Sequence, residues 1–268
     1  MGSVKNKNNS EICYRSGGLI NLTFLRKTMS IKSDSSYRLG SVTTMIVLVS
    51  GLLIVMIPIA QAQTIVNSPY VFSPDSKPYG LTYGDWSVKW WQWIESIPKD
   101  HSPLSDSTGK DCAVNQTGPV WFLAGTSGGS AERSCTIPAG KAIFAPLINN
   151  ECSYVEKKDL KTESELRACA IAGNNGATGL TATVDGVAIP NLNRLRIASP
   201  LFNLTFAPGN GAGLPPSSTQ SVSDGFWILL HPLSPGIHEI KFGGAIVGFA
   251  EGTSNNFAND VTYHLMVQ

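Results

Sequence analysis

Glu151 is the residue whose type and position are most suited to chemistry, and it lies in the segment Asn149-Asn150-Glu151-Cys152. The apolar run 141–148 predicts a strand, so we expect Glu151 at a strand end that a disulfide at Cys152 holds in place. A carboxylate there can bind a ligand or act as a general acid. Glycoside hydrolysis needs a second carboxyl group, and the sequence pairs none with Glu151. The alternative is a capped turn in which asparagine side chains bond the backbone.

Tryptophan is concentrated in residues 84–98, which hold four of the six tryptophans of the chain. Helical spacing places Trp86, Trp90 and Trp93 on one face, which we expect to pack on the body of the protein. Trp91 points elsewhere, and an exposed ring there suits a sugar or a partner protein. The alternatives are that all four rings are buried, or that the helix lies at a membrane interface, for which few lysines are near. Trp121 and Asn150 complete the candidate ligand-binding residues with Trp91 and Glu151.

The segment Gly125-Thr126-Ser127-Gly128-Gly129 matches the G-x-S-x-G pattern of a serine nucleophile. That pattern needs a strand before the serine and a helix after it. The residues that follow are too short and too β-like for a helix, so we interpret the match as a hairpin loop.

Histidines show no metal-binding spacing, so we predict no metal and no cofactor. A metal site that joins two or three of them to Asp260 or Glu151 would have to be created by the fold. The four histidines are His101, His231, His238 and His264.

The elements that must position these residues are mostly strands. Thr82 or Asp85 can cap a helix that ends before Pro98, and a capping box at Thr162 to Glu165 predicts a second helix to about residue 172, stopped by Gly173. A hairpin turns at Asp185-Gly186. Residues 207–224 read as a loop. The remaining strands are predicted at 119–124, 133–137, 141–148, 180–184, 187–189, 201–206, 226–230, 237–242 and 261–267. We therefore expect a mainly β fold, an antiparallel β-sandwich of jelly-roll or Ig-like type with two short helical insertions near its N-terminal half.

The N-terminal segment has the layout of an export signal. Basic residues precede the apolar run 45–60, and the small residues Ala60 and Ala62 follow it. We expect cleavage near Ala62 and an extracellular or cell-surface location. The alternative is an uncleaved anchor, with residues 42–66 in the membrane. The predicted organisation is a leader at 1–62, an extended linker at 63–81 and one domain at 82–268.

Charge differs between these parts. Residues 1–62 hold seven Lys and Arg against two Asp and Glu, a net charge of +5, whereas residues 63–268 hold 13 against 17, a net charge of −4. The exported part is therefore mildly acidic, which argues against nucleic acid or anionic lipid as a partner.

Four cysteines remain in the exported part, an even number that predicts two disulfides. We favour pairing Cys112 with Cys135 and Cys152 with Cys169, because each pair closes a local loop. The two other pairings stay open.

Several motifs resemble a family of exported proteins of environmental microbes. They cover nearly all of residues 79–268 and read YGLTYGDW and WWQW at 79–93, GPVWFLAG at 118–125, CTIPAGK and NNECS at 135–153, and DVTYHL at 260–265. The resemblance implies export and a single intact domain, and it assigns no catalytic residue.

These observations favour an exported protein that binds a carbohydrate, a cell-envelope component or a surface protein without catalysis. A second interpretation is a secreted hydrolase of the glycoside type that uses Glu151. A third is a structural protein of the envelope, held by an uncleaved anchor.

Overall fold

The computed structural model describes residues 68–248 and 256–268. The predictions for the leader, the anchor at 42–66 and cleavage near Ala62 fall outside these residues. The described residues belong to one compact unit. No helix in the part of the chain that the structure describes is long and apolar enough to span a membrane.

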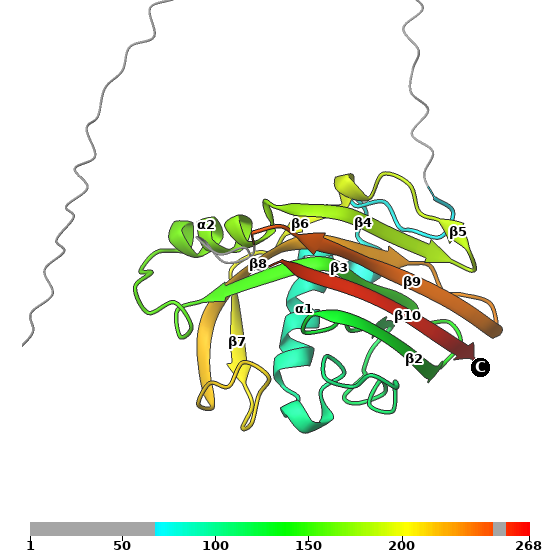
Figure 1. Ribbon diagram of the computed structural model, residues 1–268, viewed down its shortest axis with the longest axis horizontal. Coiled ribbons are helices and arrows are strands. Elements are labelled where there is room, and N and C mark those ends of the chain that lie inside the picture. Colours follow the sequence, from blue (N-terminus) through cyan, green and yellow to red (C-terminus); the bar gives the residue numbers. More distant parts are fainter. Residues whose placement is uncertain (1–67, 249–255) are drawn as a thin grey trace, which may run out of the picture. The chain divides into compact units, whose positions relative to one another are not determined.

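Two five-stranded sheets make up the fold (Figure 1). The first sheet has the order β1-β3-β8-β6, with β7 also paired to β8; its strands are β1 (Val120–Phe122), β3 (Ala142–Ser153), β6 (Arg196–Ala198), β7 (Phe202–Phe206) and β8 (Ser217–Leu230). The second sheet has the order β2-β10-β9-β4-β5; its strands are β2 (Gly129–Ile137), β4 (Ala177–Val184), β5 (Val187–Ala188), β9 (Gly236–Ile246) and β10 (Phe257–Val267).

Both sheets are mixed, whereas the sequence predicted an antiparallel sandwich. β1 is parallel to β3, and β2 is parallel to β10. The chain leaves the first sheet after β1, forms β2 in the second sheet and returns as β3, which permits a parallel pair where a tight hairpin would not. The mainly β composition with two helices is as predicted.

Two α-helices begin at the predicted caps. In α1 (Tyr83–Glu95), the Thr82 hydroxyl accepts from the Asp85 backbone N–H at 3.1 Å, and the Asp85 carboxylate accepts from the Thr82 N–H at 2.9 Å. α2 (Glu163–Asn174) begins at an equivalent box formed by Thr162 and Glu165. Gly173 lies within α2 rather than ending it. The short 3-10 helices are η1 (Pro78–Gly80), η2 (Lys99–His101) and η3 (Leu192–Leu195).

Six strands, β2, β3, β4, β8, β9 and β10, extend beyond their predicted ranges, and β6 was not predicted. The extensions of β3 and β8 bear on the candidate site. β3 continues through Ser153, so Glu151 lies inside a strand and not at its end. β8 begins at Ser217, because its Ser- and Thr-rich first half pairs with β7 from Phe206↔Ser217 to Phe202↔Ser221. The predicted loop 207–224 is shorter for that reason. The hairpin turn is as predicted, with Asp185 at φ 51° and Gly186 at φ 77°.

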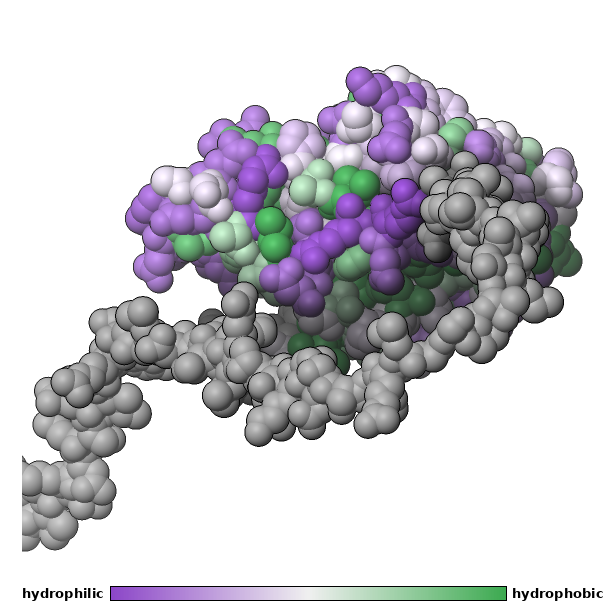
Figure 2. Space-filling model, turned by 90° about the horizontal axis from the view of Figure 1, so that it is seen from above, coloured by the Kyte–Doolittle hydropathy of each residue, from purple (hydrophilic) through white to green (hydrophobic). Residues whose placement is uncertain are grey.

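The first sheet is covered on both faces. The main core lies between the two sheets and includes Ile143, Ala145, Ile228, Leu230, Val184, Ile240, Phe242, Val261 and Leu265, each burying apolar area that favours folding. The other face of the first sheet packs against α1, and α2 lies beside β3 and β8 (Figure 1). The surface over α2 and β4 is mostly hydrophilic (Figure 2).

Both disulfides join the cysteines that the sequence paired. Cys112–Cys135 connects the loop before β1 to β2, and Cys152–Cys169 connects β3 to α2. Disulfides form in oxidising compartments, so this pair indicates an oxidising and extracellular environment.

Candidate functional site

Three of the four tryptophans on α1 serve the fold, as the helical spacing predicted. Their rings pack with Phe122, Phe144 and Trp227 in an aromatic layer between α1 and the first sheet. Each indole N–H also donates to a backbone carbonyl: Trp86 to Pro78 at 3.1 Å, Trp90 to Leu123 at 2.9 Å and Trp93 to Val114 at 2.8 Å.

Trp91 differs from these three. It is half-buried and packs beside the cluster of Val88 with the β7 residues Phe202, Leu204 and Phe206. Its indole nitrogen has no hydrogen-bond partner among the described residues. A buried indole N–H normally finds a partner, so the fold leaves one donor of Trp91 unused.

A polar patch lies on the face of the first sheet that α1 covers. Side chains alternate along a strand, so Asn149, Glu151 and Ser153 of β3 share this face. The register places Gly225, Ser223 and Ser221 of β8 directly opposite them. Ser87 of α1 reaches the patch, with its hydroxyl 3.4 Å from that of Ser223. The small β8 side chains leave room for longer groups.

Three carboxyl groups meet at the edge of this patch, and we name Glu95, Glu151 and Glu156 the carboxyl cluster. Ser221 donates a hydrogen bond to Glu151 Oε1. Glu151 and Glu156 share a hydrogen bond between their carboxyl groups, and Ser153 Oγ donates to Glu156 Oε2 at 2.5 Å. Glu95 is the last residue of α1 and is 8% exposed. Two carboxyl groups can share a hydrogen bond only if one is protonated.

The carboxyl cluster therefore binds protons tightly. Burial raises the pKa of Glu151, and the hydrogen bond and charge of Glu156 raise it further, while the Ser221 hydrogen bond lowers it. Burial and then the charge of Glu156 raise the pKa of Glu95 to about 7. Paired carboxyl groups with shifted pKa values are suited to proton exchange and to hydrogen bonding with hydroxyl groups.

Unpartnered polar atoms gather around α1 and this face of the sheet. Among the described residues, buried side-chain atoms without a hydrogen-bond partner include Trp91 Nε1, Glu95 Oε2, Asn149 Nδ2 and Trp227 Nε1. Each such group costs free energy when no partner satisfies it. The region is therefore rich in unused donors and acceptors.

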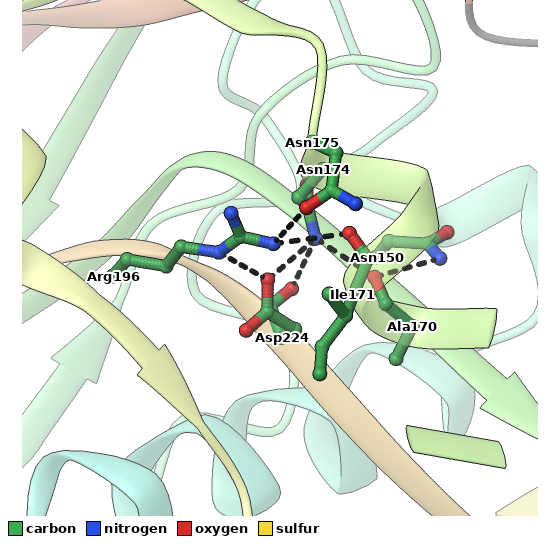
Figure 3. Close-up of polar contacts among 7 residues, drawn as sticks. All are labelled: Asn150, Ala170, Ile171, Asn174, Asn175, Arg196 and Asp224. Carbon is green, nitrogen blue, oxygen red and sulfur yellow. Dashed lines mark hydrogen bonds and ion pairs between the residues drawn. The ribbon is translucent and has the colours of Figure 1, made fainter. Parts of the chain in front are cut away.

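Two other candidate residues lie away from this site. Asn150 points to the opposite face of β3, where its Nδ2 atom is 3.5 Å from the Ala170 carbonyl of α2 (Figure 3). Trp121 is 7% exposed and belongs to the main core. The alternation of β3 separates Asn150 from Glu151, although they are adjacent in the sequence.

The surroundings of Asn150 are structural. Arg196 of β6 donates to Asp224 Oδ1 at 2.8 Å and to the Ile171 carbonyl at 3.0 Å, and Asn174 donates to the Asp224 carbonyl at 2.7 Å (Figure 3). Burial raises the pKa of Asp224 despite the Arg196 partner. These contacts hold α2 against β6 and β8.

Ser127 and the histidines form no catalytic arrangement in the described part of the chain. Ser127 lies in the exposed loop before β2. The sequence predicted a hairpin loop here, but the loop instead connects β1 of the first sheet to β2 of the second sheet. His238 Nδ1 is 2.8 Å from Asp185 Oδ2, His264 Nε2 is 2.8 Å from Glu132 Oε1, and the His231 ring packs on Phe72. No group of three His, Cys, Asp or Glu residues suited to a metal occurs within residues 68–248 and 256–268.

Glu95 and Glu156 are the members of the carboxyl cluster that sequence reasoning missed. Glu95 closes a helix, and Glu156 follows β3 in a turn, so no common spacing links them to Glu151. The turn after β3 brings Glu156 to Glu151, and the packing of α1 on the first sheet adds Glu95.

No family model and no curated protein matches this chain. Among solved structures it is similar to PbICP-C from a complex with falcipain-2, with 10% identity, a TM-score of 0.22, and 55% of this chain and 98% of that chain covered. It is also similar to the cysteine protease inhibitor EhICP2 of Entamoeba histolytica, with 13% identity, a TM-score of 0.20, and 55% of this chain and 94% of that chain covered. The likeness to amebosin has 12% identity, a TM-score of 0.19, and 56% of this chain and 100% of that chain covered. Likenesses this distant carry no argument about function. The fold and the site define this protein as a disulfide-bonded, mainly β domain.

Proposed function

We propose that this protein is exported and binds a carbohydrate, without catalysis, through Trp91 and the adjoining carboxyl cluster. The observation that carries the proposal is the contrast on α1: three indoles are buried and hydrogen-bonded, whereas the ring of Trp91 is partly exposed. The Trp91 Nε1 atom itself is buried, so the exposed part of the ring is the surface that would meet the ligand. Ligand sites in proteins combine an apolar or aromatic surface with a few polar groups. Glu151 and Glu156 supply such groups to sugar hydroxyls.

Carboxyl spacing argues for binding rather than glycoside hydrolysis. The catalytic carboxyl groups of glycosidases lie about 5–5.5 Å or about 6.5–9.5 Å apart. The hydrogen bond and the charge of Glu156 both raise the pKa of Glu151, which indicates two carboxyl groups in direct contact rather than on opposite sides of a glycosidic bond.

A glycan array tests the proposal. We expect the purified protein to bind at least one glycan, and Trp91→Ala to weaken that binding about tenfold or more, as at an aromatic hot spot. The control is Lys89→Ala, an exposed neighbour on α1, which leaves binding unchanged. If the protein captures a cell-surface protein but no glycan, its ligand is a protein and not a carbohydrate. Equal glycan binding by the protein and by Trp91→Ala would rule out this site.

The second candidate is a hydrolase that uses Glu151 as a general acid, and the pKa of Glu151, which burial and Glu156 raise, is the observation that favours it. Reducing sugar released from the bound glycan, and lost in Glu151→Gln, would establish this function. Recovery of intact glycan after prolonged incubation would contradict the hydrolase and support binding without catalysis.

We infer export from the leader sequence, and mass spectrometry of the protein isolated from its native cells and their medium tests it. A mature chain that begins at Gln63 means cleavage, whereas an intact leader means the anchored alternative. The jelly-roll or Ig-like assignment also stays a prediction, which an experimental structure of the domain tests.

A further inference from the structure

A second polar pocket lies away from the carboxyl cluster, between loop 99–107 and the loop before β2. It is a cavity of about 420 Å³. Its lining is rich in hydroxyl groups, from Ser102, Ser105, Ser107, Thr126, Ser127 and Ser130, and it includes Arg133. The Gly125–Gly129 segment that resembles a nucleophile motif thus forms a wall of this pocket.

Arg133 is an unusual residue to find there, because it is a cation with 1% exposure. β2 alternates, and Arg133 takes an inward position in line with Cys135 and Ile137. Its Nε donates to the Asp106 carbonyl at 2.7 Å, Nη1 to the Ala124 carbonyl at 2.6 Å and to the Tyr263 hydroxyl at 2.7 Å, and Nη2 to the Gly125 carbonyl at 3.0 Å.

All of these partners are neutral. A guanidinium carries five N–H donors, so one Nη2 hydrogen has no partner among the described residues. No carboxylate of the described chain lies within ion-pair distance of Arg133. Buried charges in proteins are normally paired. Although burial opposes the shift, hydrogen bonds from the Asp111 and Thr108 N–H groups, and then the charge of Arg133, lower the pKa of Asp106, so this ionised carboxylate balances part of the charge of Arg133. Arg133 still keeps one unused N–H donor.

Asp106 and Glu132, two acidic groups nearby, are held by other contacts. Asp106 lines the pocket, but its Oδ1 accepts from the Thr108 N–H and hydroxyl and its Oδ2 from the Asp111 N–H. Lys99 at the rim adds a second positive charge. Glu132 and Asp260 line a neighbouring cavity, which shares Ser107, Ser130 and Ala131 with this pocket, and Glu132 is paired with His264.

We propose that this pocket binds a small oxyanion, a sulfate, phosphate or carboxylate group. Arg133 supplies the buried positive charge, Lys99 adds attraction at the entrance, and the loop hydroxyls donate hydrogen bonds. The site does not depend on the carbohydrate proposal, because it shares no residue with the carboxyl cluster.

NMR titration of the ¹⁵N-labelled protein tests this site. Sodium sulfate, phosphate and acetate are added separately, with sodium chloride keeping the ionic strength constant. We expect saturable shifts of the backbone amides at 125–130, and the anion with the lowest dissociation constant identifies the oxyanion class.

Two variants keep Arg133 and its packing intact. Lys99→Gln removes an exposed charge and should weaken binding about threefold to fivefold. Ser127→Glu places a competing carboxylate in the loop and should abolish binding. The matched controls are Lys89→Gln and Ser164→Glu, exposed residues outside the pocket that should leave binding unchanged. Circular dichroism verifies that each variant is folded.

Shifts that grow linearly with every anion, or saturable shifts that persist unchanged in Ser127→Glu, would overturn the proposal. Loss of the shifts in the control variants as well would show nonspecific attraction of anions by surface charge, which also contradicts it.

Discussion

The carboxyl cluster shows how burial and like charges act together on single residues. Glu95 has one buried carboxylate oxygen without a partner, and its pKa is raised to about 7. Charging this group in the folded protein means removing it from water beside Glu156. The folded state therefore holds protons that the unfolded chain would release.

This linkage predicts a pH dependence of stability. The unfolded chain titrates Glu95 near 4.5, whereas the folded protein titrates it near 7. The contribution of Glu95 to stability is fully present below pH 4.5 and is lost as the pH rises to about 7. In this range the folded state binds more protons than the unfolded chain, so raising the pH favours unfolding. Glu151, with its raised pKa, extends the loss to higher pH. We expect the melting temperature to fall between pH 5 and pH 8.

Replacing Glu95 checks the assignment. Glu95→Gln should make the fall of the melting temperature from pH 5 to 8 less steep, with Glu151 causing the part that remains, as measured by differential scanning fluorimetry. The control Asp159→Asn, in an exposed turn, should keep the wild-type profile. An unchanged slope in Glu95→Gln would mean that Glu95 titrates normally.

At this scale the sequence identified Glu151 and Trp91 but not Glu95 or Glu156. A glutamate that closely follows an apolar run can be recognised from the sequence alone. The partners of Glu151 come from a helix end and a turn, and their meeting depends on how α1 packs, which no local spacing encodes.

Among the elements, α1 has the most direct link between sequence and structure. The sequence offered Thr82 or Asp85 as the cap of this helix. Both take part, because they lie three residues apart and form a capping box. The ends of β3 and β8 were not predictable, because Asn, Ser and Thr read as loop residues until pairing with neighbouring strands places them in a sheet.

Removing the cap of α1 should be measurable. Thr82→Ala loses the hydroxyl that accepts from the Asp85 N–H, and we expect the free energy of unfolding to fall by about 1 kcal/mol. Urea denaturation followed by tryptophan fluorescence measures it. Thr117→Ala, an exposed site with no such role, should change stability by less than about 0.5 kcal/mol. Equal effects of the two substitutions would show that the cap does not stabilise α1.

For the whole molecule, the disulfides were predictable and the sheet topology was not. Each disulfide closes a short loop, with sequence separations of 23 and 17 residues. The parallel pairs β1–β3 and β2–β10 depend on the path of the chain between two sheets, which strand periodicity does not contain.

Both disulfides should stabilise the whole fold by similar amounts. Replacing either pair, Cys112 with Cys135 or Cys152 with Cys169, by alanine should lower the free energy of unfolding by about 3 kcal/mol, since the closed loops are of similar length. Denaturation in urea measures the loss. Peptide mapping that found the alternative pairings, or variants as stable as the parent, would contradict this account.

The central claim is that Trp91 forms the ligand-binding surface while the other rings on α1 belong to the core. NMR of the six tryptophan indoles, during titration with a glycan selected on the array, tests it most directly. Trp91→Phe assigns the signal of Trp91. We predict a saturable shift of the Trp91 signal, with Trp90 and Trp227 unchanged. Saturable glycan binding that leaves the Trp91 signal in place would contradict the claim.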